Sequence, residues 1–145
     1  MNSVSRSALV SFSAQQMFDL VEGVEQYPQF LPWCSGASVS LRDPEFTHAT
    51  IQINYRGIKQ SFSTKNHKEA PGLMTLQLVE GPFRSLDGEW RFTPLGETAC
   101  RIDFRLSYEF AGVLLEKLVG PVFGHIAGTM VDAFLKRADS IYGQS

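Results

Sequence analysis

The sequence predicts an α+β domain in which a curved antiparallel sheet of about seven strands wraps around one long C-terminal helix, with two short helices after the first strand. From about residue 36 to residue 110, apolar and polar residues alternate, and turn signals containing Gly or Pro separate the alternating runs. Residues 113–142 form one long, mostly apolar helical stretch. Because a sheet must cover its apolar face, this helix is expected to lie across it.

The N-terminal segment predicts a strand followed by a short helix. Residues 3–10 have strand character. Ser13 and Gln16 then have the spacing of a capping box, in which each side chain accepts a hydrogen bond from the other residue's backbone N–H. The helix that follows is expected to end near Glu22.

Residues 24–34 predict a lid or plug. The two prolines of this segment, Pro28 and Pro32, forbid a long helix. Large apolar side chains are nevertheless concentrated in it: Tyr27, Phe30, Leu31 and Trp33. So much aromatic surface in a short, proline-braced segment indicates that it closes an apolar space.

The last strand, residues 100–110, shows the clearest alternation. Every second residue from Cys100 to Phe110 is cysteine or a large apolar or aromatic residue, and the residues between them are polar. One face of the strand therefore belongs to the core and the other faces water. The same pattern assigns inward positions on the preceding strands, among them Ile53, Leu76 and Trp90. Short spacers between the runs favour an antiparallel meander.

The long helix carries Gly120, Gly124 and Gly128 at every fourth position, so they share one row. Glycine costs about 1 kcal/mol relative to alanine inside a helix, and three on the buried side therefore need a reason. Two interpretations stay open: close packing of the helix backbone against the sheet, or space left for a ligand. Pro121 predicts a kink or a new start, with Val113 to Val119 as a separate first piece.

Length and charge limit the classes of function. With 145 residues, the chain predicts a single domain, residues 1–145. The net charge of −2 gives no general attraction to DNA or to anionic membranes. Because there is no signal peptide and no apolar run of about 18 residues without a polar break, we expect a cytoplasmic protein with no transmembrane segment. Cys34 and Cys100 are predicted to be buried free thiols.

The sequence contains no recognisable pattern for catalysis or for metal or cofactor binding. His48, His67 and His125 fall at outward or polar positions, where surface histidines are expected. No serine occupies a Gly-x-Ser-x-Gly elbow, and neither cysteine has a recognisable histidine partner. There is no glycine-rich phosphate loop. We therefore predict no catalytic residue, no metal and no cofactor.

The predicted site is an apolar cavity between the sheet and the C-terminal helix. Such a cavity suits a flat or long hydrophobic molecule with one or two polar atoms. Its predicted lining comes from the lid, the inward strand positions and the helix: Phe30, Leu31, Trp33, Ile53, Tyr55, Leu76, Phe83, Trp90, Phe104, Tyr108, Gly120, Phe123, Gly124, Ala127, Met130 and Val131.

A basic strand face is a second candidate site. Five basic residues cluster within a short span: Arg56, Lys59, Lys65, His67 and Lys68. Lys59 and Lys65 share the outward parity of their strand, opposite Phe62. Such a face is either simply solvated or a landing surface for RNA or an acidic partner, and Lys59 and Lys65 are its predicted contacts.

Three stretches carry a resemblance to a known family: residues 27–34, 79–92 and 130–138. Together they resemble the coenzyme Q-binding, polyketide-cyclase-like branch of the START-domain superfamily, whose fold is called a helix-grip. Some members bind ubiquinone and support respiration, and one bacterial group is a toxin proposed to bind the large ribosomal subunit and block its joining to the small one. The family has no motif of catalytic residues that maps onto this chain.

Three functions follow from this resemblance and from the residues. The first is non-enzymatic binding of a hydrophobic molecule, such as an isoprenoid quinone, linked to respiration. The alternative is a ribosome-association regulator that uses the basic face, and the two are compatible if ligand occupancy controls ribosome binding. A cyclase or hydratase is the least favoured, because the inward positions show no acid and base pair.

Overall fold

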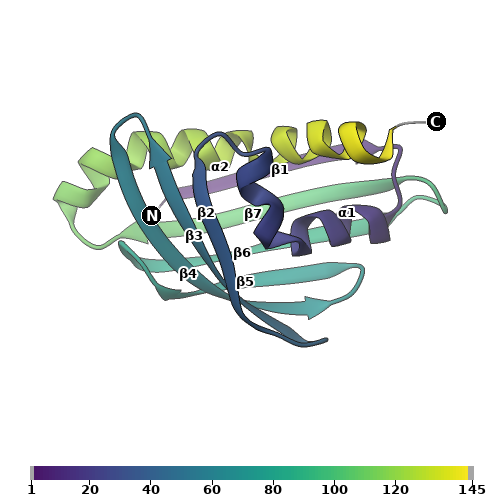
Figure 1. Ribbon diagram of the computed structural model, residues 1–145, viewed down its shortest axis with the longest axis horizontal. Coiled ribbons are helices and arrows are strands. Elements are labelled where there is room, and N and C mark those ends of the chain that lie inside the picture. Colours follow the sequence, from purple (N-terminus) through teal and green to yellow (C-terminus); the bar gives the residue numbers. More distant parts are fainter. Residues whose placement is uncertain (1, 144–145) are drawn as a thin grey trace.

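The computed structural model describes residues 2–143, which form seven strands, two α-helices and one 3-10 helix (Figure 1). In chain order these are β1 (Asn2–Val10), α1 (Ala14–Glu22), η1 (Val24–Gln29), β2 (Cys34–Arg42), β3 (Phe46–Tyr55), β4 (Ile58–Glu69), β5 (Leu73–Glu80), β6 (Phe83–Pro94), β7 (Cys100–Phe110) and α2 (Val113–Tyr142). This element order confirms the α+β prediction, including both short helices after the first strand.

All seven strands form one antiparallel sheet in the order β1-β7-β6-β5-β4-β3-β2. Strands β2 to β7 are a meander, as the short spacers predicted. Strand β1 then closes the order by pairing with β7, so the first and last strands of the chain are neighbours. This pairing was not predicted, because alternation along one strand does not reveal its partner.

The N-terminal helix begins with the predicted capping box. The Ser13 side chain accepts a hydrogen bond from the Gln16 backbone N–H (3.1 Å), and the Gln16 side chain accepts one from the Ser13 backbone N–H (2.9 Å). Helix α1 ends at Glu22, also as predicted. Its apolar face is buried against the sheet, where Phe18 meets the Phe92 ring edge-on at 6.1 Å.

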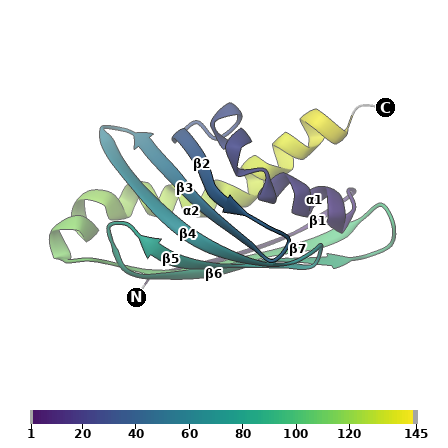
Figure 2. The same ribbon diagram turned by 60° about the horizontal axis from the view of Figure 1, so that its bottom comes forward.

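The sheet is strongly curved, and the helices lie on its concave side (Figure 2). Register shifts interrupt the ladders in β2, at the β4–β5 pair and at the start of β6. Such bulges bend a strand and increase its twist. Gly88 allows β6 and β7 to approach closely, because a β-carbon there would lie 2.6 Å from the Arg105 carbonyl oxygen of β7. The curvature creates the concave space that α2 fills.

Helix α2 runs without interruption through Pro121. The prediction of a separate first piece over residues 113–119 is therefore wrong. Proline removes one backbone hydrogen bond, to the carbonyl four residues earlier, which here belongs to Lys117. Both Pro121 and Lys117 are exposed, so water can satisfy that carbonyl and the helix continues.

By length and composition α2 resembles a membrane span, contrary to the expectation that no such run exists. In the structure one side of this helix packs on the sheet and contributes to the core. Its buried residues are Val119, Phe123, Ile126, Ala127, Val131, Phe134 and Ala138. Its first turns remain exposed at Val113, Leu114 and Leu118.

Both cysteines are free and buried, as predicted. Burial raises the pKa of the Cys34 thiol and of the Cys100 thiol above the ordinary value. The reactive thiolate is therefore disfavoured at both positions. This fits a packing role for the two side chains.

Candidate functional site

An apolar cavity of about 60 Å³ lies between the sheet, α1, η1 and α2. Its wall is built by residues from nearly every element: Val21, Val24, Tyr27, Trp33, Ala49, Ile51, Phe62, Thr64, Asn66, Met74, Leu76, Leu86, Trp90, Phe104, Leu106, Phe123, Ile126 and Met130. Six of the predicted site residues are among them: Trp33, Leu76, Trp90, Phe104, Phe123 and Met130. The structure thus brings these six residues together around a small space, and their role in ligand binding stays a prediction.

The described wall of this cavity contains no Asp, Glu, His, Lys or Arg side chain. Its polar groups are amides, hydroxyls and the Trp33 and Trp90 indoles. Tyr27 donates its hydroxyl to the Val21 carbonyl, and desolvation raises its pKa, so the phenol stays neutral. Thr64 and Asn66 hydrogen-bond each other across 2.7 Å. The wall can thus hold an apolar molecule and offer it a few neutral hydrogen-bonding groups.

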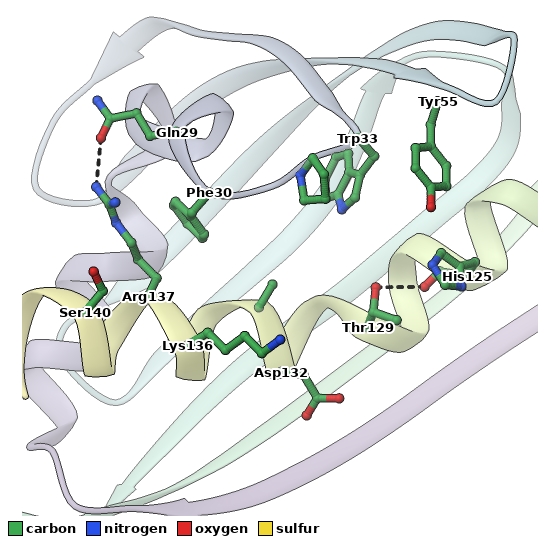
Figure 3. A pocket seen from close by; sticks show the side chains of 12 residues that line it. Gln29, Phe30, Trp33, Tyr55, His125, Thr129, Asp132, Lys136, Arg137 and Ser140 are labelled. Carbon is green, nitrogen blue, oxygen red and sulfur yellow. Dashed lines mark hydrogen bonds between the residues drawn. The ribbon is translucent and has the colours of Figure 1, made fainter.

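A larger groove of about 600 Å³ lies outside the cavity, between η1, the η1–β2 segment, the end of β3 and α2. Figure 3 shows Phe30, Trp33 and Tyr55 side by side above α2. Trp33 lines both the groove and the cavity, and it is only 4% exposed. Because it borders both spaces, this indole forms a partition between them, and the lid role of its segment stays a prediction.

The groove combines aromatic and polar side chains. The Tyr55 ring stacks on the His125 ring at 6.0 Å and nearly parallel. Arg137 donates a hydrogen bond to Gln29 Oε1 (2.8 Å), and its guanidinium lies over the Phe30 ring at 5.1 Å (Figure 3). Phe30 also meets the Phe134 ring at 5.2 Å. These contacts attach the lid segment to α2 along the groove.

Other predicted site residues lie in the packed core beside the cavity and not on its wall. This group contains Leu31, Phe83, Tyr108, Ala127 and Val131, all buried. Phe83, Tyr108 and Phe123 form an aromatic cluster with centroids 4.8 to 6.1 Å apart. Ile53 is also buried, and it borders a separate polar groove around Lys59. Strand and helix periodicity correctly predicted that these residues face the core, but it could not distinguish packed core positions from positions on the cavity wall.

The glycine row does not line the cavity, so the interpretation of these glycines as space for a ligand is corrected. An added β-carbon would face β7 or β1 in each case: it would lie 3.8 Å from Phe110 Cε2 at Gly120, 3.9 Å from Tyr108 Oη at Gly124 and 3.3 Å from Arg6 Nη2 at Gly128. The helix face on the cavity is the adjacent one, with Phe123, Ile126 and Met130. Helical periodicity correctly predicted that the glycines lie on the inner side of α2. It could not determine the rotation of α2 about its axis, which turns the glycines toward β1 and β7.

Some residues of the two spaces were missed. Thr64 and Asn66 share the inward parity of Phe62 on β4, so alternation was the available signal, but their polarity made them unlike core residues. His125 is exposed, as predicted for a surface histidine, yet it helps to line the groove. Arg137 also lines the groove and was used only as part of the family resemblance.

The basic face is smaller than predicted. Lys59 and Lys65 are exposed on the outer face of β4, and Lys65 lies over the Phe46 ring at 4.4 Å. Lys68 has the opposite parity, so its side chain is only 7% exposed and pairs with Glu22 at 3.1 Å. Its inclusion in the basic cluster is therefore corrected. No ion pair of Lys59 or Lys65 occurs among residues 2–143.

The ion pairs around Glu22 have a structural role. Arg42 of β2 donates to Glu22 Oε1 (2.8 Å) and to both carboxylate oxygens of Glu25 (2.7 and 2.8 Å). Thr47 donates to the same Glu22 oxygen (2.9 Å). The hydrogen bonds from Arg42 hold the pKa of Glu25 below its ordinary value. This network fastens α1 and η1, which carry part of the cavity wall, to β2, β3 and β4.

Fold and cavity together define a helix-grip protein, in which a curved sheet encloses a long helix and an apolar space. Residues 10–135 match the family described as polyketide cyclase / dehydrase and lipid transport, and the chain belongs to this family. The resemblance of this chain to the polyketide-cyclase-like branch of the START-domain superfamily is thereby confirmed.

The chain is 44% identical to "Ribosome association toxin RatA" of Vibrio cholerae over 144 residues, which cover 99% of this chain and 100% of that protein. It is 30% identical to "Coenzyme Q-binding protein COQ10 homolog B, mitochondrial" of Xenopus laevis, over 97% of this chain and 59% of that protein. Among solved structures, the ZhuI aromatase/cyclase from Streptomyces superposes with a TM-score of 0.84 over 99% of this chain and 98% of that chain. Its identity is 10%, so this likeness shows the fold alone.

Proposed function

We propose that this protein is a ribosome-association regulator that binds the large ribosomal subunit and hinders its joining to the small one. The observation that carries the proposal is the 44% identity to a ribosome association toxin over practically the whole length of both chains. The match covers 99% of this chain and 100% of that protein, so the similarity is not confined to one segment. Such a role places the protein in the cytoplasm, as the sequence suggested.

The outer face of the sheet around β4 is the proposed contact. Lys59 borders an open groove of about 730 Å³ that is also lined by neutral polar residues, among them Gln52 and Asn54, and by one carboxylate, Glu80. On β6 and β7, by contrast, arginines and carboxylates pair with each other, as for Arg105 with Glu89 at 3.4 Å. Lysines that form no ion pair suit an RNA backbone better than a face of paired charges does.

Sucrose-gradient sedimentation tests both the role and the contact. The wild-type protein is expected to co-migrate with the large subunit and to lower the fraction of joined ribosomes. The double charge reversal Lys59→Glu with Lys65→Glu is expected to weaken co-migration, while the unfolding midpoint stays close to wild type because exposed charges contribute under about 1 kcal/mol to stability.

The matched control is Lys117→Glu with Arg101→Glu, which changes the net charge equally at exposed positions on other elements. This control should sediment like the wild type. If the wild type itself does not co-migrate with the large subunit, the proposed role is wrong. If the Lys59/Lys65 variant still co-migrates normally, the role stands and the contact lies elsewhere.

A second candidate function is non-enzymatic binding of a hydrophobic molecule such as an isoprenoid quinone. The apolar wall, free of acid and base side chains, supports binding without catalysis. The relative named coenzyme Q-binding protein supports the same class of ligand. The cavity of about 60 Å³ is smaller than a quinone with its isoprenoid chain, so binding requires side chains to move. Met74 and Met130 on the wall are suited to such adjustment.

Organic extraction of the purified protein followed by mass spectrometry tests this second function. A co-purified lipid, or saturable binding of an added quinone, is the expected result. Absence of both would contradict lipid binding and would leave the ribosomal role unaffected.

A further inference from the structure

Two polar side chains are buried among the apolar residues of the cavity wall. Asn66 is 4% exposed and Thr64 is 6% exposed, and both project from β4 toward the concave side of the sheet. Their wall neighbours are mainly aliphatic, aromatic or methionine side chains. A buried amide is costly unless its hydrogen bonds are made, so this pair calls for an explanation.

The hydrogen bonds of Asn66 are only partly made. The Thr64 hydroxyl donates to Asn66 Oδ1 at 2.7 Å, which uses one acceptor site of the amide. An asparagine amide also carries two N–H donors on Nδ2. Among residues 2–143, the side-chain hydrogen bond of Asn66 is the one from Thr64. Of the cross-strand neighbours, Leu76 is apolar, and the Thr47 hydroxyl donates to Glu22 and makes no hydrogen bond with Nδ2. Nδ2 is not one of the fully enclosed side-chain atoms that lack a partner, so it borders the cavity space that Asn66 lines.

We infer that the cavity selects hydrophobic molecules that carry a carbonyl group, and that Asn66 Nδ2 donates a hydrogen bond to this carbonyl. The inference rests on the proposed hydrophobic-ligand function and adds the chemistry by which the site chooses its ligand. A carbonyl oxygen accepts hydrogen bonds and donates none, so it matches the free donors of the amide. Thr64 is a positioning residue, since its hydroxyl holds Oδ1 and thereby turns Nδ2 toward the ligand.

The positions of the cavity and the groove indicate how such a molecule lies. The cavity is too small for a whole lipid, but Trp33 lines both the cavity and the groove of about 600 Å³. When Trp33 turns aside, the carbonyl end enters next to Asn66. The apolar remainder extends past Trp33 and along Phe30 and Tyr55, which lie in a row with it above α2 (Figure 3).

Binding of two matched probes tests the inference. The first is a decyl-substituted benzoquinone, and the second is decylbenzene, which has a similar ring and the same chain but no carbonyl. Because water solvates the quinone carbonyls and not decylbenzene, the measured quantity is the ratio of the two affinities, compared between wild type and Asn66→Leu, which removes the donor at similar volume. The ratio of quinone to decylbenzene affinity is expected to be about tenfold higher in wild type than in Asn66→Leu, because one good hydrogen bond in an apolar site is worth roughly this factor.

Thr64→Val provides the positioning control. It leaves the Asn66 donor in place but frees the amide to rotate, so an intermediate preference for the quinone is expected. It also serves as the second variant if Asn66→Leu does not fold, and unfolding midpoints are measured for both. A merely structural hydroxyl would change the midpoint without changing the ratio of the two affinities.

Three outcomes overturn the inference. The same affinity ratio in wild type and in Asn66→Leu would show that Asn66 does not select the ligand and is satisfied by a trapped water, while lipid binding itself would stand. A preference for the corresponding hydroquinone, which presents hydroxyl donors, would show the opposite hydrogen-bond polarity. Failure to bind either probe would remove the hydrophobic-ligand function, and with it the inference.

Discussion

Gly88 and Gly124 show how differently two inward glycines act. At Gly88 a β-carbon would lie 2.6 Å from the Arg105 carbonyl oxygen, which is backbone and cannot move away cheaply. At Gly124 the nearest atom is Tyr108 Oη at 3.9 Å, an ordinary contact distance. The first glycine is therefore required by close packing of two strands, whereas the second occupies a place that a methyl group fits.

We predict opposite effects of alanine at these two positions. Gly124→Ala should stabilise the protein by about 0.5–1 kcal/mol, because alanine favours a helix by about that amount and the added methyl meets no obstacle. Gly88→Ala should destabilise it by about 1–3 kcal/mol through overpacking against β7. Urea denaturation of both variants measures the two changes. A destabilised Gly124→Ala protein would contradict the free space at this position.

At the scale of the elements, ion pairs attach α1 and η1 to the sheet. This attachment holds the part of the cavity wall that α1 and η1 contribute. Arg42 at the end of β2 binds Glu22 at the end of α1 and Glu25 in η1. These pairs join segments that are adjacent in space and separated in sequence. Glu25 keeps a lowered pKa because its carboxylate accepts hydrogen bonds from the Arg42 guanidinium.

The lowered pKa of Glu25 predicts a specific loss of stability in acid. The folded protein favours the ionised carboxylate, and the ordinary pKa is 4.5. The stabilisation is therefore complete above about pH 4.5 and disappears as the pH falls through the lower pKa of the folded state. The free energy of unfolding, measured from pH 6 to pH 3, should fall more steeply in wild type than in Glu25→Gln.

Glu97→Gln is the control for this pH series, because Glu97 is exposed and has no ion pair within the described residues. Its profile should follow the wild type. Parallel profiles for Glu25→Gln and wild type would show that the Arg42 contact does not contribute to stability.

At the scale of the whole molecule, charge is distributed unevenly even though the net charge is only −2. Lys59 and Lys65 on the outer face of β4 lack carboxylate partners within the described chain. The arginines of β6 and β7 have such partners, as Arg91 does with Glu89 at 3.4 Å. Any attraction to RNA is therefore local and limited to a few contacts.

This distribution predicts a moderate salt dependence of ribosome binding. Two phosphate contacts should make the affinity about tenfold weaker between 50 and 200 mM salt. Co-sedimentation at graded salt concentrations measures the slope. No salt dependence would exclude the lysines as contacts, and a loss of a thousandfold or more would require a much larger basic surface than Lys59 and Lys65 provide.

The sequence by itself determined the fold class, the meander of strands, the capped α1 and the long covering helix. These features depend on alternation, helical periodicity and caps, which are properties of neighbouring residues and are therefore visible in one chain. The resemblance in residues 27–34, 79–92 and 130–138 led to the same family that the match over residues 10–135 established. Buried polar positions such as Asn66 could also have been identified from the sequence, since their parity along β4 is inward.

Only the tertiary structure decided how the site is assembled. Helical phase places Gly124 and Phe123 next to each other, but the rotation of α2 turns Phe123 to the cavity and Gly124 to Tyr108 of β7. Strand parity makes Lys68 inward, but Glu22 on α1 explains how its charge is accommodated there. Trp33 became the partition because η1 folds back onto α2. Each of these depends on the relative placement of distant elements, which is set by packing over the whole core and not by any local pattern.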